Sequence, residues 1–132
     1  FWNNILQTNL NGTFLCSKYA IPYMEKRGGG HILNLHGGGS PNTVGTCSYA
    51  VTKDAIWTFT KHVAEEIRSM GIMMAILSPG GPIATEDAPE EARLRMYGPE
   101  LVADRFVLAA QAGMEMSGHR LALEDGALVT DD

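Results

Sequence analysis

The two side chains in this sequence best suited to chemistry are a tyrosine and a lysine four residues apart, Tyr49 and Lys53. In a helix this spacing places both side chains on one face, about one turn apart. An ammonium group at that distance stabilises a phenolate electrostatically, which suits the tyrosine to act as a general acid or base. The same spacing is also common on helices that simply pack a tyrosine beside a solvated lysine. The elements around the pair therefore decide between the two interpretations.

Other groups of reactive side chains have weaker patterns. The stretch His36-Gly37-Gly38-Gly39 is similar to the oxyanion-hole loop of lipases and esterases, but no serine lies in the Gly-x-Ser-x-Gly turn that such a hydrolase requires. The four histidines and two cysteines lack the spacing of metal ligands. A carboxylate cluster is typical of a solvated face, although paired-carboxylate catalysis stays open for it. Its members are Glu86, Asp87, Glu90 and Glu91.

Length and charge limit the classes of protein that the sequence fits. The 132 residues suit one domain, and a hydrophobic content of 45% is typical of a globular chain. A net charge of −5 argues against the basic surface of a protein that binds nucleic acid or anionic membranes. No apolar run approaches the roughly 18 residues of a membrane span, and no signal peptide is recognisable. Since two cysteines are too few for a disulfide framework, we expect reduced thiols in a cytoplasmic protein without nucleic-acid or membrane partners.

Helical patterns alternate with short apolar runs along the chain. Helices are expected over residues 2–27, over 48–70, within 85–98 and from Pro99 onward. Pro22 is expected to kink or interrupt the first helix, and Ser48 is expected to cap the second. The polar segment that follows Thr85 is predicted to be a mobile lid.

Three short apolar runs predict the strands. They cover residues 31–36, 72–77 and 121–123, and Glu124-Asp125-Gly126 closes the last of them. Because strands and helices alternate, the fold class is α/β, with three parallel strands joined by crossover helices. Ligands of such sheets bind at the carboxyl ends of the strands. The loop after the first strand, the Ser78-Pro79-Gly80 turn and the start of the helix with Tyr49 all belong to that edge, which favours a chemical role for the tyrosine.

With these elements in place, the chain resembles the short-chain dehydrogenase/reductase family over nearly its whole length. The matching stretches, in order, are Thr8–Phe14, Gly30–Leu35, Tyr49-x-x-x-Lys53, Gly71–Gly80, Pro82–Thr85 and Ser117–Gly126. The resemblance implies an NAD- or NADP-dependent oxidoreductase that transfers a hydride at a carbonyl or alcohol carbon of a small molecule. It also implies a Rossmann-like parallel sheet, with residues 1–132 forming a single partial domain that corresponds to the C-terminal half of the doubly wound fold.

The resemblance assigns roles to individual residues. Tyr49 would exchange a proton with the substrate oxygen, and Lys53 would favour its phenolate and hold the nicotinamide ribose. Asn9 would correspond to the asparagine that binds a water molecule in the proton relay of the family. Four residues match the segment that lies along the nicotinamide, namely Pro79, Gly80, Ile83 and Thr85.

The sequence departs from the family pattern at three places. Gly37 stands where the family has its catalytic serine, and a glycine has no hydroxyl to stabilise an oxyanion. Ser40 is the nearest hydroxyl, three positions later. Pro79-Gly80-Gly81-Pro82 contains one glycine more than the common family spacing. No Gly-x-Gly-x-x-Gly turn opens a helix in these residues, so the phosphate site and the choice between NAD and NADP are not encoded in them.

Two functions from different classes follow. The first is a dehydrogenase that uses Tyr49, Lys53 and Asn9, and the alternative is a truncated or degenerate module of the same fold that binds or oligomerises without catalysis. In either case the resemblance implies a homo-oligomer formed through the helices at 2–27 and 48–70. A partial sheet would also leave the strand at Ile32–Leu35 as an exposed edge.

Overall fold

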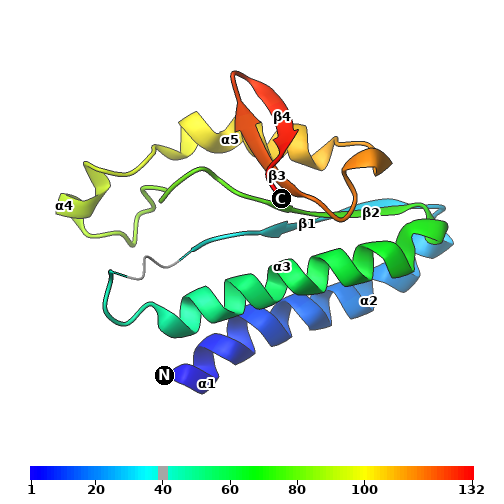
Figure 1. The fold of residues 1–132 in the computed structure, drawn as a ribbon, viewed down its shortest axis with the longest axis horizontal. Helices are drawn as coiled ribbons and strands as arrows, with labels where there is room; N and C mark the ends of the chain where they lie inside the picture. The colour runs from blue at the N-terminus through cyan, green and yellow to red at the C-terminus, as the bar shows by residue number, and fades with distance from the viewer. Residues whose placement is uncertain (39–41) are drawn as a thin grey trace.

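In the computed structural model, which describes residues 1–38 and 42–132, a sheet of four strands lies between two layers of helices (Figure 1). Helices α1, α2 and α3 cover one face, and α5 covers the other (Figure 1). The strands are β1 (Gly30–Leu35), β2 (Ile72–Leu77), β3 (Arg120–Glu124) and β4 (Ala127–Thr130). The helices are α1 (Trp2–Ile5), α2 (Gly12–Lys26), α3 (Cys47–Ile67), α4 (Glu90–Arg93) and α5 (Pro99–Ala110), with shorter helical turns at Leu6–Asn11, Arg68–Met70 and Met114–Met116. The predicted α/β class is confirmed.

The sheet has the order β1-β2-β3-β4, and its first three strands are parallel. β2 is buried along its whole length, which agrees with its continuous apolar sequence. β1 forms one edge, and its residues are half-buried or exposed, so the predicted edge strand is confirmed. Its neighbour β2 therefore forms the centre of the core.

The prediction of three strands is wrong because a fourth strand, β4, pairs antiparallel with β3. Asp125 and Gly126 both have positive φ, 49° and 79°, and Glu124 pairs with Ala127 across them. Two such residues form the tight hairpin turn that Asp-Gly sequences favour. The Asp125-Gly126 turn therefore connects two strands and does not simply end one.

The helix predicted over residues 2–27 is continuous from Trp2 to Lys26 but not uniform. Leu6–Asn11 winds as a π-helix, next to the Asn11-Gly12 pair. The interruption predicted at Pro22 does not occur, because the proline lies inside α2 on an exposed side of the helix. At an exposed position, the carbonyl that loses its partner to the proline ring is accessible to water.

The second long helix matches its prediction closely. α3 runs from Cys47 to Ile67, and the turn Arg68–Met70 continues it to Gly71, whose φ of 72° ends it. The cap is Thr46 and not Ser48, because Ser48 is already helical and buried. Within the predicted lid, the short helix is only the single turn α4.

Side chains from β2 alternate between two apolar clusters, one on each face of the sheet. Met73, Ala75 and Leu77 pack with α5 and β3. Ile72 and Met74 pack with α3 and α2. The core therefore fixes α3 relative to the carboxyl ends of β1 and β2.

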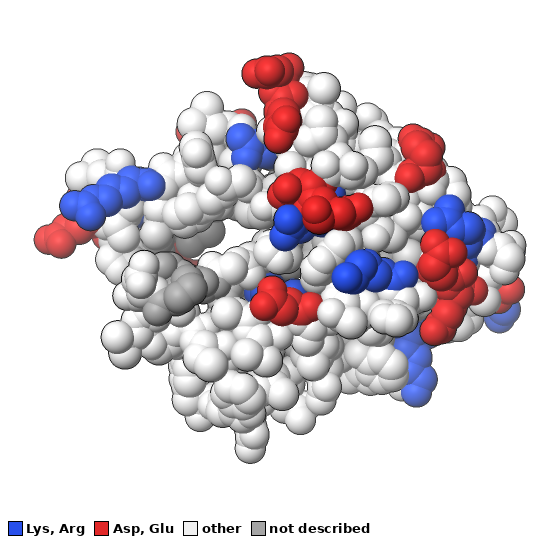
Figure 2. All heavy atoms as spheres, in the orientation of Figure 1, with Lys and Arg blue, Asp and Glu red and all other residues white. Residues whose placement is uncertain are grey.

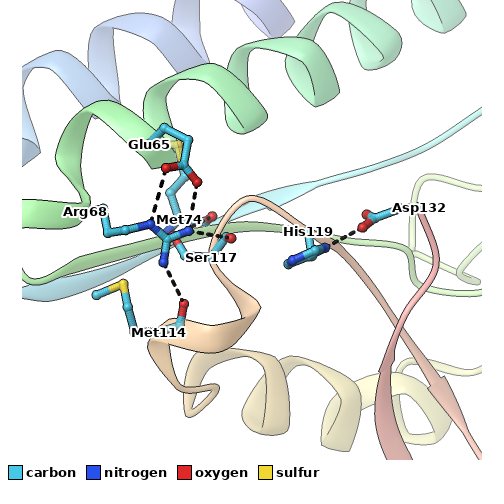
Figure 3. A network of polar contacts seen from close by, with 7 residues as sticks. All are labelled: Glu65, Arg68, Met74, Met114, Ser117, His119 and Asp132. Atoms are coloured by element: carbon cyan, nitrogen blue, oxygen red, sulfur yellow. Dashed lines mark hydrogen bonds and ion pairs between the residues drawn. The ribbon is translucent and has the colours of Figure 1, made fainter.

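A polar network ties the end of α3 to the approach to β3 (Figure 3). Arg68 pairs with Glu65 at 2.9 Å and also donates to the carbonyls of Met114 and Ser117, both at 3.4 Å. The Arg68 hydrogen bond lowers the pKa of the Glu65 carboxyl. In the same view the His119 ring bonds the Asp132 carboxylate, which anchors the C-terminal residues beside β3 (Figure 3).

Candidate active site

A cavity of about 520 Å³ lies at the carboxyl ends of β1 and β2, beside the start of α3. Its lining consists of Leu35, His36, Gly37, Gly38, Tyr49, Lys53, Ser78, Pro79, Gly81, Pro82, Ile83 and Phe106. In the space-filling view a hollow is visible between the upper layer, which carries α4 and α5, and the lower layer, which carries α3 (Figure 2). This is the edge of the sheet at which the strand order predicts a ligand site.

Tyr49 and Lys53 occupy the first two turns of α3 and both line the cavity. The Lys53 ammonium donates to the Leu35 carbonyl at 3.1 Å and lies 5.5 Å from the centre of the Tyr49 ring. Burial lowers the pKa of Lys53. The spacing of four residues therefore brings a phenol and a partly desolvated cation into one cavity, as the sequence predicts.

Gly37 lies directly against the Tyr49 phenol. A Cβ atom built on Gly37 would collide with the phenol oxygen and lie 3.2 Å from Cζ of the same ring. The space of a side chain at position 37 is thus filled by the tyrosine itself. In contrast, a Cβ atom on Gly38 would meet no atom of residues 1–38 and 42–132 within 4 Å.

Asn9 does not line the cavity but supports the turn that carries Tyr49. It lies in the π-helical segment, and its side-chain amide donates to the Thr52 hydroxyl at 3.0 Å. The Thr52 hydroxyl in turn donates to the Tyr49 carbonyl at 2.7 Å. Thr52 is fully buried, so these bonds are shielded from competing water.

The residues expected along a nicotinamide separate into two groups. Pro79 and Ile83 line the cavity together with Tyr49 and Lys53. Gly80 and Thr85 belong to the same segment but are not part of the lining. Ser40 lies outside the described residues.

Several lining residues have no role in the sequence prediction. They are the apolar residues Leu35, Pro82 and Phe106, and Ser78, which directly follows β2. The sequence signal for these residues is their position, because Leu35 and Ser78 lie at the carboxyl ends of strands and Phe106 lies on the helix that covers the sheet.

His36 is a further lining residue without a role in the sequence prediction. Its Nε2 atom lies 4.0 Å from the Asp54 carboxylate. Burial lowers the pKa of His36, and the nearby Arg120 and Lys53 cations act in the same direction, against Asp54. The imidazole is thereby favoured in its neutral form.

The described part of the chain has neither the side-chain grouping of a metal site nor the helix of a membrane span. Among residues 1–38 and 42–132, no group of three or more His, Cys, Asp or Glu side chains is arranged to hold a metal ion. No helix there has both the length and the hydropathy of a membrane span. Lys and Arg are interspersed with Asp and Glu on the face shown in Figure 2.

Comparisons with known proteins show which family the chain is similar to. The sequence profile of the short chain dehydrogenase family matches residues 1–93. The chain is 30% identical to a 3-oxoacyl-[acyl-carrier-protein] reductase of Synechocystis sp., over 97% of this chain and 56% of the relative. It is 31% identical to a D-beta-hydroxybutyrate dehydrogenase of Rhizobium meliloti, over 83% of this chain and 44% of the relative.

The fold matches solved structures as well. The crystal structure of acetoin dehydrogenase from Enterobacter cloacae superposes with a TM-score of 0.76 at 24% identity, covering 95% of this chain and 54% of that one. The chain therefore spans about half the length of the relatives it matches.

Proposed function

The chain belongs to the short-chain dehydrogenase/reductase family of oxidoreductases, and on this basis we propose that its cavity is the acid–base end of an NAD(P)-dependent enzyme. The reaction class is hydride transfer at a carbonyl or alcohol carbon of a small molecule. The observation that carries the proposal is the convergence of Tyr49, Lys53, Pro79 and Ile83 on one cavity at the carboxyl edge of the sheet.

Tyr49 is the group that exchanges a proton with the substrate oxygen. Its side chain is 39% exposed and lines the cavity, so a substrate oxygen has access to the phenol. The Lys53 ammonium lies 5.5 Å from the centre of the Tyr49 ring, where a partly desolvated cation attracts negative charge on a bound substrate oxygen more strongly than one in bulk water. Asn9 acts on the same turn through Thr52, by fixing the carbonyl of Tyr49.

The Lys53 ammonium and the apolar residues Pro79 and Ile83 in the cavity lining support the nicotinamide riboside end of NAD or NADP as its ligand. The ring supplies or accepts the hydride when it is bound. Lys53 would hold the ribose hydroxyls, and Pro79 and Ile83, the two members of the predicted segment that line the cavity, would lie along the ring. The chain contains no Gly-rich phosphate turn that opens a helix, so the pyrophosphate would be held by a part of the fold outside these residues.

The absence of a hydroxyl at Gly37 supports a second function, that of a non-catalytic module of the same fold. In the enzyme, the Tyr49 phenol would be the hydrogen-bond donor to the substrate oxygen without help from a serine at that position. In the module, the cavity would bind no nicotinamide. The two functions therefore differ in the affinity of the cavity for nicotinamide, which a binding experiment measures.

We also propose that the chain assembles as a homo-oligomer through residues 2–27 and 48–70. These helices expose large apolar side chains outside the cavity, namely Trp2, Phe14, Leu15, Tyr19, Tyr23 and Val51. In Figure 2 the region over α1, at the lower left of the molecule, shows no charged side chains. Both cysteines, Cys16 and Cys47, are free thiols, which supports a cytoplasmic location.

Binding of reduced nicotinamide mononucleotide tests the proposal, because this probe needs only the riboside end of the site. Titration followed by nicotinamide fluorescence is expected to show saturable binding to the chain. Lys53→Met is expected to weaken it about tenfold or more, as the loss of a charge-assisted hydrogen bond does. Lys61→Met is the matched control, because Lys61 lies on α3 against Trp57 and not in the cavity. Absent binding, or equal effects of the two variants, would support the module instead.

A further inference from the structure

The additional glycine after Pro79 has a structural explanation in two side chains from outside the turn. A Cβ atom on Gly80 would collide with Nη1 of Arg105 and lie 3.4 Å from its Cζ. A Cβ atom on Gly81 would lie 2.6 Å from Cε2 of Tyr97. Both glycines thus provide the space in which Arg105 and Tyr97 lie against the backbone.

Arg105 joins α5 to this turn and to the end of the lid. Its Nη1 atom donates to the Pro79 carbonyl, and its guanidinium lies 5.7 Å from the centre of the Tyr97 ring. Its Nε atom is the one buried side-chain nitrogen or oxygen, within residues 1–38 and 42–132, that has no hydrogen-bond partner. Because an unpaired buried donor is unfavourable, the remaining contacts must hold the guanidinium in this place.

Tyr97 closes the base of the predicted lid, the segment that follows Thr85, because its backbone bonds the residues just before that segment. Its amide donates to the Pro82 carbonyl at 2.9 Å, and its carbonyl accepts from the Ala84 amide at 2.8 Å. Ile83 and Tyr97 thereby form an isolated parallel bridge. The ring of Tyr97 is placed between this bridge and Arg105, so the two ends of the lid and α5 meet at one point.

We propose that Arg105 is a positioning residue, which acts through the Pro79 carbonyl and the Tyr97 ring to hold residues 79–83 where they line the cavity. The assignment of that cavity to a nicotinamide rests on the proposed function. The contact between Arg105, Tyr97 and the two glycines does not, and it sets the position of Pro79 and Ile83 whatever ligand binds there. The segment would hold its ligand less well when the guanidinium is removed, while Tyr49 and Lys53, on a different element, would stay in place.

Amide hydrogen exchange of the chain itself, measured by NMR, tests the positioning contact independently of any activity. In Arg105→Met, the exchange rates of the Ala84 and Tyr97 amides are expected to rise about tenfold, because a hydrogen bond and a cation–π contact are lost. Arg105→Lys is expected to lie between Met and wild type, since an ammonium replaces one of the two contacts but not both. Gly81→Ala is expected to reproduce the Met result by displacing the Tyr97 ring.

The matched control is Leu94→Ala, at a residue of the same lid that is 88% exposed. It is expected to leave both exchange rates unchanged. If Arg105→Met exchanged like wild type, or if Leu94→Ala had the same effect as Arg105→Met, the positioning role would be overturned.

Kinetics of a full-length form separate this role from a general loss of structure. Arg105→Met is expected to raise the KM for the dinucleotide about tenfold and to change kcat less than threefold, with partial rescue by Arg105→Lys. A fall in kcat alone would overturn the positioning role. A wild-type protein without dehydrogenase activity would refute the proposed function, and the exchange experiment would then decide on Arg105 by itself.

Discussion

Two successive hydrogen bonds, from Asn9 to Thr52 and from Thr52 to the backbone of Tyr49, hold the turn of α3 that carries Tyr49. Removing the first of them is expected to lower the free energy of unfolding by a predictable amount. Asn9 donates to the Thr52 hydroxyl at 3.0 Å, and that hydroxyl donates to the Tyr49 carbonyl at 2.7 Å. Asn9→Ala removes the first bond and leaves the second intact. Because Thr52 keeps one partner, the expected loss is that of an ordinary hydrogen bond, about 1 kcal/mol in the free energy of unfolding.

Urea denaturation of the chain measures this loss directly. For a domain of this size, with a slope of about 2 kcal/mol per molar urea, 1 kcal/mol shifts the midpoint by about 0.5 M. A double-mutant cycle with Thr52→Val isolates the pair, because Asn9→Ala should cost much less once the hydroxyl is gone. We expect a coupling energy of about 1 kcal/mol between the two positions.

The chain contains a matched control for this experiment. Asn34 donates to the Thr60 hydroxyl at 2.9 Å, and Thr60 donates to the Ile56 carbonyl at 2.8 Å, two turns further along α3. Asn34→Ala is expected to cost a similar free energy without moving the NMR resonances of the Tyr49 ring, whereas Asn9→Ala should shift them. A coupling energy near zero for Asn9 and Thr52, or Tyr49 shifts equal in the two variants, would refute the reasoning.

The remaining predictions concern the residues at the mouth of the cavity. Gly37→Ala is expected to displace the Tyr49 ring by roughly 0.5–1 Å, since its Cβ would start 3.2 Å from Cζ, and to lower turnover of a full-length form by about tenfold to 100-fold. Gly38→Ala should leave the Tyr49 resonances unchanged, because its Cβ atom would meet no atom of the described residues within 4 Å. An equal shift of these resonances in both variants would contradict the account. Because the pKa of His36 is lowered in the folded chain, the unfolded chain binds more protons just below pH 6.5, so stability should rise with pH up to 6.5 and fall on acidification through the folded pKa. Urea midpoints between pH 5 and 8 measure how stability changes with pH. This dependence should become flatter in His36→Gln, and an unchanged dependence would argue against the pKa shift.

The fold was largely predictable because its signals are local. Each signal depends on a few neighbouring residues: a continuous apolar run for β2, and helical periodicity that ends at Gly71 for α3. These signals placed both elements within a residue or two of their observed bounds. β4 was missed because it is short and partly exposed, so that the Asp125-Gly126 turn was its strongest signal. The prediction for Pro22 failed because exposure, which decides the cost of a proline in a helix, is a tertiary property.

The candidate site was predictable only in part, for a related reason. Tyr49 and Lys53 lie on one helix, so their spacing alone brings them together. The contacts of Arg105 and Tyr97 with Gly80 and Gly81 join residues far apart in the chain, and no local pattern connects them. In the sequence the additional glycine therefore remained a departure from the family spacing, whereas in the structure it makes room for the Tyr97 ring.

The central claim is that Tyr49 is the acid–base group of a nicotinamide-dependent dehydrogenase. The most direct test is turnover of Tyr49→Phe in a full-length form, with dinucleotide binding measured in parallel and Tyr19→Phe, at an exposed tyrosine of α2, as control. The account predicts a fall in kcat of about 100-fold or more, as expected for the loss of a general acid or base, with dinucleotide affinity changed by less than about threefold. Turnover equal to that of wild type would contradict it.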